Sequence, residues 1–357
     1  MIKRIRWVAW ALLLSCALML SGCLDRSAGG ALSRQGTAAL ERKDYNTALA
    51  DFQQAIVNGE DEVVAYRGQG IAMMGLAQYT QAAGSFETAL SYTDSRMPET
   101  VRDIRLYLAS ARFREGNYEE LVAVCEELLE EEELTEGHFY LGAAYLHMDE
   151  IDEAKSEFDQ AVALSPKDYQ LYLQIYEQYA DMNRTATGDE YLQQALQIPA
   201  ESSEDAYHLG QIYYYLEQYE QAQLVLSDPA AEKYIPAMQL LGEVYLAQED
   251  YSHAHSIYQS IRDENGESSL VYNGLTLCAI ASGEYSLALE YITAGLAIED
   301  ESEEEDAQQS LRFNEIIVYE KLLDFQTALV KAESYYALYP TDEAGHRELV
   351  FLRTRGQ

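Results

Sequence analysis

The chain repeats a pattern of small and aromatic residues with a period of 34 residues. The recurrence is clearest in the pairs Gly36 and Gly70, Tyr45 and Tyr79, Ala48 and Ala82, Phe52 and Phe86, and Ala55 and Ala89. A later copy spaces Ala154, Phe158 and Ala161 at i, i+4 and i+7, which puts all three on one face of a helix. One helix pair cannot bury such a face alone, whereas stacked pairs share a continuous core. The period therefore predicts an array of helix pairs.

One copy carries the pattern most fully. Its first helix contains Leu141, Gly142 and Tyr145, and its second contains Ala154, Phe158 and Ala161. Gly142 and Ala154 are small enough for the two helices to approach closely, and Pro166 is expected to end the second helix. This set resembles the tetratricopeptide repeat (TPR), with His138 at a position where the family prefers Trp.

Nine copies of the pattern begin near residues 29, 63, 102, 135, 169, 203, 235, 269 and 309. The resemblance covers nearly all of the chain after residue 30. It implies an all-α fold, an α-solenoid superhelix of about nine helix-turn-helix repeats over residues 31–340. Residues 341–357 read as one extra helix whose arginines form a polar face suited to capping the open end of the array. Pro229 lies where the second helix of the sixth repeat should continue, so that helix is expected to be short.

The N-terminus has the pattern of a secretory leader. Lys3, Arg4 and Arg6 precede an apolar run over residues 7–20, which is too short to span a membrane comfortably. The run ends in Leu-Ser-Gly followed by Cys23, which resembles the bacterial lipobox. The resemblance implies that residues 1–22 are a signal peptide and that Cys23 becomes the lipid-bearing first residue.

An anchor of this kind carries at least two acyl chains and holds stably, because each buried CH₂ contributes about 0.8 kcal/mol. Residues 23–30 then form a tether, and the protein is expected to be extracytoplasmic. It would lie on the outer face of the cytoplasmic membrane, or on an outer membrane if the cell has one.

The charge is strongly one-sided. The sequence has 24 basic and 61 acidic residues, a net charge of −37, and the leader removes three basic residues and no acidic one. Such a negative field repels nucleic acid, so a nucleic-acid partner is excluded. Cys125 and Cys278 lie five repeats apart and are expected to be buried apolar residues, not a disulfide.

No set of residues predicts catalysis, a cofactor or a metal site. The Gly-Gln-Gly at residues 68–70 lacks the third glycine and the preceding strand of a dinucleotide loop. His253 and His255 are two apart, so they face different directions on a helix. The acidic runs at residues 126–133 and 300–306 lack the spacing and glycine of a calcium loop. They are expected to be solvated, with weak divalent-cation binding as the alternative.

Proteins of the TPR family bind partners on a concave surface lined by particular positions of the first helices. In this register the candidate binding residues are Phe139, Leu146, Leu173, Glu177, Tyr207, Gln211, Tyr214, Gln239, Glu243 and Leu246. Chaperone-binding members place Lys and Asn there to clamp a carboxylate, whereas this chain has Phe139 and Ala143, or Tyr207 and Gln211. A carboxylate clamp is therefore not expected. The lining suits an extended or helical peptide segment, and its glutamates favour one with basic residues.

The resemblance therefore implies a membrane-anchored scaffold that binds peptide segments of envelope or secretion partners, with no enzymatic activity. The alternative is a glycan-binding TPR lipoprotein of a polysaccharide-export or cell-wall system. A clustered row of exposed tyrosines would favour the glycan, and a mixed leucine, isoleucine and phenylalanine lining would favour the peptide.

Overall fold

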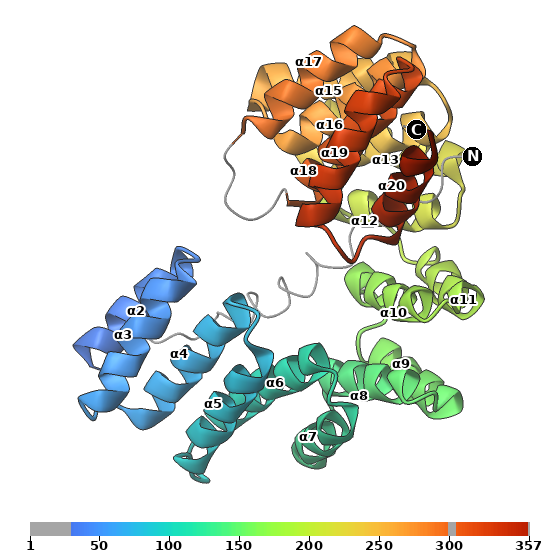
Figure 1. Ribbon diagram of the computed structural model, residues 1–357. Coiled ribbons are helices and arrows are strands. Elements are labelled where there is room, and N and C mark those ends of the chain that lie inside the picture. The colour runs from blue at the N-terminus through green and yellow to red at the C-terminus, as the bar shows by residue number, and fades with distance from the viewer. Residues whose placement is uncertain (1–29, 299–304, 356–357) are drawn as a thin grey trace. The chain divides into compact units, whose positions relative to one another are not determined.

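The computed structural model describes residues 30–298 and 305–355, and the leader, Cys23 and most of the tether lie outside them (Figure 1). The chain divides after Tyr191 into two compact units. We call residues 30–191 the N-terminal unit and residues 192–355 the C-terminal unit. All regular secondary structure in these ranges is helical.

The N-terminal unit contains α2 (Ala31–Glu41), α3 (Tyr45–Val57), α4 (Glu62–Gly75), α5 (Tyr79–Ser91), α6 (Pro98–Glu115), α7 (Tyr118–Glu131), α8 (Thr135–His147), α9 (Ile151–Leu164) and α10 (Tyr169–Asp181). Helix α11 (Thr185–Ala195) runs across the boundary. The C-terminal unit contains α12 (Ser203–Tyr215), α13 (Tyr219–Ala231), α14 (Ile235–Ala247), α15 (Tyr251–Asn265), α16 (Ser269–Ala281), α17 (Tyr285–Leu296), α18 (Glu305–Lys321), α19 (Phe325–Leu338) and α20 (Glu343–Arg355).

The predicted fold class, an all-α solenoid of helix pairs, is confirmed. Over the described residues the 19 helices form nine consecutive pairs followed by α20, the extra helix expected after Pro340. Helix α6 begins at Pro98, a residue well suited to a first helical turn. None of the described helices is both long and apolar enough to cross a membrane.

The turn inside each pair is built in the same way nine times. A residue with φ between +56° and +79° lies two positions before each second helix, namely Lys43, Ala77, Gly116, Asp149, Asn183, Glu217, Glu249, Gly283 and Leu323. The next residue then donates its N–H to the carbonyl five positions earlier, as Glu150 does to Tyr145 at 2.9 Å. This bond satisfies a free carbonyl at the end of the first helix and reverses the chain.

Aromatic rings of the second helices pack against glycines of the first helices. A Cβ added to Gly142 would lie 2.9 Å from the ring of Phe158 and 3.1 Å from the carbonyl of Ala154, so the expected close contact is present. The ring of Phe52 also meets glycines of two successive pairs, Gly36 in its own and Gly68 in the next. The contact therefore joins the helices of one pair and also joins that pair to its neighbour.

First helices of successive pairs touch one another, α2 through α10 in the N-terminal unit and α12 through α18 in the C-terminal unit. Within each unit the second helices α3, α5, α7, α9, α13, α15 and α17 pack between the first helix of their own pair and that of the next. We call the row of first helices in either unit the first-helix layer. It is the layer to which the sequence assigned the candidate binding residues.

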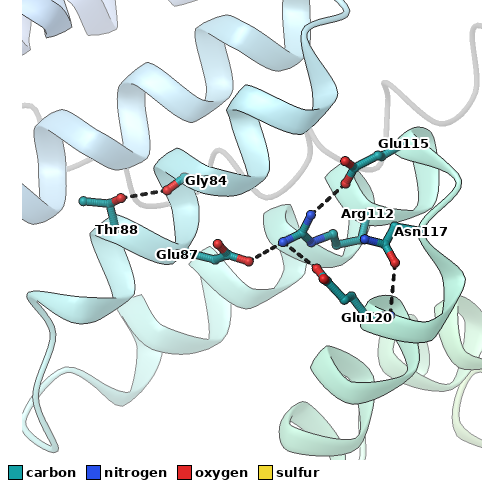
Figure 2. Close-up of polar contacts among 7 residues, drawn as sticks. All are labelled: Gly84, Glu87, Thr88, Arg112, Glu115, Asn117 and Glu120. Carbon is teal, nitrogen blue, oxygen red and sulfur yellow. Dashed lines mark hydrogen bonds and ion pairs between the residues drawn. The ribbon is translucent and has the colours of Figure 1, made fainter.

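A buried arginine links three helices of the N-terminal unit (Figure 2). The guanidinium of Arg112 on α6 pairs with Glu115 at 2.8 Å, with Glu120 of α7 at 2.6 Å, and with Glu87 of α5. Its side chain is 11% exposed, whereas those of Glu87 and Glu120 are more than half exposed. One cation in this strongly acidic chain therefore offsets three carboxylates at a helix junction.

The prediction for Pro229 is wrong. Helix α13 continues through Pro229 to Ala231, because its packing against α12 and α14 stabilises it despite the one N–H donor that proline lacks. The carbonyl of Pro229 accepts a hydrogen bond from the N–H of Tyr234, with an N–O distance of 3.0 Å. Cys125 and Cys278 are buried and free, as expected, and burial raises the pKa of the Cys278 thiol to about 12.

Replacing Gly142 with leucine should destabilise the fold, because the new side chain would overlap the ring of Phe158 and approach the Ala154 backbone. We expect a loss of about 1–3 kcal/mol in the free energy of unfolding. Gly84→Leu is the matched control, since Gly84 is also inside a helix but has no neighbouring atom within 4 Å of an added Cβ. It should be neutral or stabilising, because leucine favours helix more than glycine does. Equal unfolding midpoints for the two variants, followed by circular dichroism, would contradict this packing.

Candidate functional site

The predicted binding residues of the N-terminal unit are mostly inside the helix packing. Phe139, Leu146 and Leu173 are 4%, 0% and 1% exposed. The ring of Phe139 lies 5.9 Å from that of Phe158, within the core of its own helix pair. A partner could reach these three side chains only if helices moved apart.

Glu177 on α10 is the half-buried member of this group. Its Oε1 atom is buried with no hydrogen-bond partner among the described residues. Burial, with a smaller contribution from the charge of Asp181, raises the pKa of Glu177 to about 8 from the usual 4.5. The fold therefore holds a carboxyl group here without a compensating cation.

The predicted residues of the C-terminal unit form a partly open polar and aromatic surface on α12 and α14, and Gln211, at 7% exposed, is the buried member of the group. Gln211 donates from its amide nitrogen to the hydroxyl of Tyr207 at 3.1 Å. His208 Nδ1 lies 2.9 Å from Gln211 Oε1, and since an amide oxygen only accepts, the histidine donates. The ring of Tyr207 also meets Tyr234 edge-on, with 6.0 Å between centroids. These contacts fix Tyr207 while leaving it half-buried.

Tyr214 lies two turns further along α12. Its ring meets Tyr219 edge-on at 5.7 Å and Tyr215 at 6.2 Å. Both Tyr207 and Tyr214 pack on one side against the apolar cluster around Leu226 and Val244. The two rings are therefore braced by the core and still partly exposed.

Glu243 on α14 lies next to these tyrosines. Burial raises the pKa of Glu243 to about 7. Burial first, and the nearby Glu243 charge second, raise the pKa of Tyr207 to about 12, and the same two causes raise that of Tyr214. Both phenols are therefore neutral at physiological pH. Glu243 is half-buried, and within the described residues it makes neither an ion pair nor a hydrogen bond.

The other two predicted residues on α14 flank Glu243 along the helix. Gln239 is half-buried and lies one turn before it. Leu246 is also half-buried and packs against the apolar cluster that contains Tyr258 and Leu275. The structure thus brings Tyr207, Gln211 and Tyr214 together with the α14 side chains.

Two members of this surface were not predicted. Tyr234 precedes α14 in the connection between pairs, and His208 follows Tyr207 on α12. The repeat register assigns neither to a binding position. Only the docking of α12 against α14 places Tyr234 on the edge of Tyr207.

The surface has the chemistry of a binding site. In the ranges that the structure describes, no three His, Cys, Asp or Glu side chains cluster so as to hold a metal ion. Helices α12 and α14 carry two phenol rings, one amide group and one carboxyl group that has no cation partner among the described residues. Such groups can contact a partner through stacking, hydrogen bonds and charge.

Comparison with known families matches residues 135–168 to the tetratricopeptide repeat. This segment contains α8 and α9, so that pair is a TPR unit. No curated protein shows significant similarity to the sequence.

Several solved structures are similar in fold at low sequence identity. A chain of the APC/C hetero-tetramer Cut9–Hcn1 has 13% identity and a TM-score of 0.44. The match covers 81% of the present chain and 55% of the Cut9–Hcn1 chain, so the present chain spans about half the length of that protein. A tetratricopeptide repeat protein from Parabacteroides merdae has 10% identity and a TM-score of 0.45, with coverages of 71% and 98%. The pilF protein of Pseudomonas aeruginosa has 17% identity and a TM-score of 0.40, with coverages of 62% and 97%.

Replacing Glu177 with glutamine should stabilise the fold at alkaline pH. The folded pKa is raised, so the contribution of Glu177 to stability is fully present below about pH 4.5 and is lost as the pH rises towards 8. Glu177→Gln should therefore match the parent near pH 4.5 and unfold at a higher temperature at pH 8.5. Glu190→Gln, at an exposed position of α11, is the control and should show no such pH-dependent gain. A lower midpoint for Glu177→Gln at pH 8.5 would contradict the assignment.

Proposed function

We propose that this protein is a membrane-anchored TPR lipoprotein that holds protein partners against its first-helix layer outside the cytoplasm. The observation that carries the proposal is the TPR unit at residues 135–168, set in a run of nine helix pairs. Repeats of this family serve as protein-interaction scaffolds. The chain is accordingly proposed to bind and not to catalyse.

The tyrosines of α12 help to distinguish between a peptide and a glycan as the bound partner. Tyr207, Tyr214 and Tyr234 do cluster, which is the feature that stacking on sugars requires. However, Tyr207 and Tyr214 are half-buried, and the carboxylate of Glu243 favours a positively charged group, which a neutral sugar does not carry. A peptide with polar and basic groups therefore satisfies this surface better than a glycan does.

The anchor is proposed from the leader and Cys23. An acylated N-terminus would hold the helix pairs at a membrane surface while leaving the first-helix layers free to meet other envelope proteins. The acidic body would also be kept away from anionic lipid headgroups by charge repulsion.

Replacing Cys23 with serine should abolish lipidation, because serine has no thiol to accept the lipid. We expect the chain to leave the membrane fraction or to keep its leader, as judged by fractionation and by mass spectrometry of the N-terminus. Cys278→Ser is the control, since it removes a buried thiol from the folded body and should leave the lipid in place. An unmodified Cys23 at the N-terminus of the parent protein would overturn the anchor.

Photo-crosslinking can test whether partners meet the first-helix layer. Benzoylphenylalanine at Gln239, on α14, should give discrete protein adducts in intact cells, whereas the same group at Glu220, exposed on the second helix α13, should not. Adducts destroyed by protease indicate protein, and adducts that resist protease but yield sugar indicate the glycan alternative. Adducts at Glu220 alone, or at neither position, would contradict the proposal.

A further inference from the structure

Glu243 is the candidate binding residue of the C-terminal unit whose charge no described side chain balances. It lies half-buried on α14, and desolvation raises its pKa to about 7. It accepts no hydrogen bond and joins no ion pair among residues 30–298 and 305–355. Burying part of an ionised carboxylate is costly unless a cation or hydrogen-bond donors compensate it.

The chain supplies almost no cation that could reach this position. Between Arg184 and Arg262, Lys233 is the only lysine or arginine in the sequence. Its ammonium group already pairs with Glu264 on α15, at 2.6 Å. Arg262, near the end of α15, pairs with Asp263 at 3.2 Å. Within their described residues, helices α12 to α15 therefore present Glu243 without an ion-pair partner.

Two aromatic rings on α12, which packs against α14, lie within electrostatic reach of the carboxylate and are held in position. Tyr207 is oriented by the His208–Gln211 hydrogen-bond chain and by the edge contact with Tyr234. Tyr214 is braced by Tyr219. A cation over the face of a tyrosine ring is favoured by the ring's quadrupole, and more strongly where water is partly excluded. Because these rings are already fixed, a ligand would lose little of its affinity to ordering them.

We propose that Glu243, together with the rings of Tyr207 and Tyr214, binds an arginine side chain of a partner protein. This inference rests on the proposed scaffold function and names the chemistry of one contact within it. Arginine suits the site because its planar guanidinium pairs with a carboxylate through two hydrogen bonds and stacks on aromatic rings. The overall charge of −37 would also attract a basic segment from solution.

The other ligand classes fit the site less well. A phosphate or carboxylate would be repelled by Glu243, and a neutral sugar could donate hydroxyl hydrogen bonds to it but would bring no opposite charge. A divalent cation would find a single carboxylate here, too few hard ligands to replace its water shell. Arginine is the occupant that uses the carboxylate and both rings.

The test is calorimetric titration of the full-length protein in detergent micelles with a tri-arginine peptide. Tri-citrulline, which keeps the shape and loses the charge, is the ligand control. The titration is carried out in about 0.15 M salt, which screens interactions between exposed charges over distances beyond roughly 8 Å. We expect tri-arginine to bind the parent protein and tri-citrulline not to bind. Glu243→Gln should weaken tri-arginine binding tenfold or more, and Tyr207→Leu with Tyr214→Leu should weaken it as well.

Glu220→Gln is the matched variant, because it removes the same charge from an exposed position on α13 and should change the affinity less than twofold. The thermal midpoint of Glu243→Gln should equal or exceed that of the parent at pH 8, since a partly buried charge has been removed. Equal tri-arginine affinity in Glu243→Gln, or equal binding of tri-citrulline, would overturn the inference. Adducts at Gln239 that persist in the Glu243→Gln protein would leave the scaffold function standing while the arginine contact fails.

Discussion

The architecture depends on a close approach between a glycine of a first helix and an aromatic or leucine side chain of a second. The backbone has no side chain at Gly36, Gly142 and Gly242, so the ring of the facing helix packs directly against it. A side chain at these positions would push the two helices apart. Because Phe52 and Tyr258 also touch glycines of the following pair, the same contact sets the spacing between pairs as well as within them. The large buried rings then contribute apolar area that no isolated pair could bury.

Among the described residues, this packing gives some charged groups of the first helices an ion-pair partner and leaves others without one. The few basic residues are used at helix junctions, as where Arg112 meets three glutamates, or where Arg67 of α4 pairs with Asp103 of α6 at 2.5 Å and lies over the ring of Tyr107. Glu177 and Glu243 receive no such cation, and burial raises the pKa of each. Uncompensated charge that the fold tolerates is a common mark of a binding surface. At Glu243 it coincides with the half-buried Tyr207 and Tyr214 of α12.

Much of the fold was predictable because a 34-residue period constrains both local structure and packing at once. Tyr45 and Tyr79 begin second helices, and Phe52 and Phe86 are buried, as the periodic pattern implies. The turns were less predictable, since seven of the nine left-handed positions are not glycine and carry residues as different as Ala77 and Leu323. The continuation of α13 through Pro229 was not predictable from the sequence, because it depends on how strongly α12 and α14 stabilise that helix.

The sequence by itself determined the number of helix pairs, the identity of the core rings and the face of each helix that packs, because these follow from spacing along the chain. It also determined the acidic charge and the lipobox-like Cys23. Only the tertiary structure decided which first-helix side chains are open, since a register position does not say how tightly neighbouring helices pack there. Phe139, Leu146 and Leu173 are covered, whereas Tyr207, Tyr214 and Glu243 stay half-open. Among the described residues Glu243 also makes no ion pair, and Lys233, the lysine or arginine closest to it in sequence, pairs with Glu264 instead.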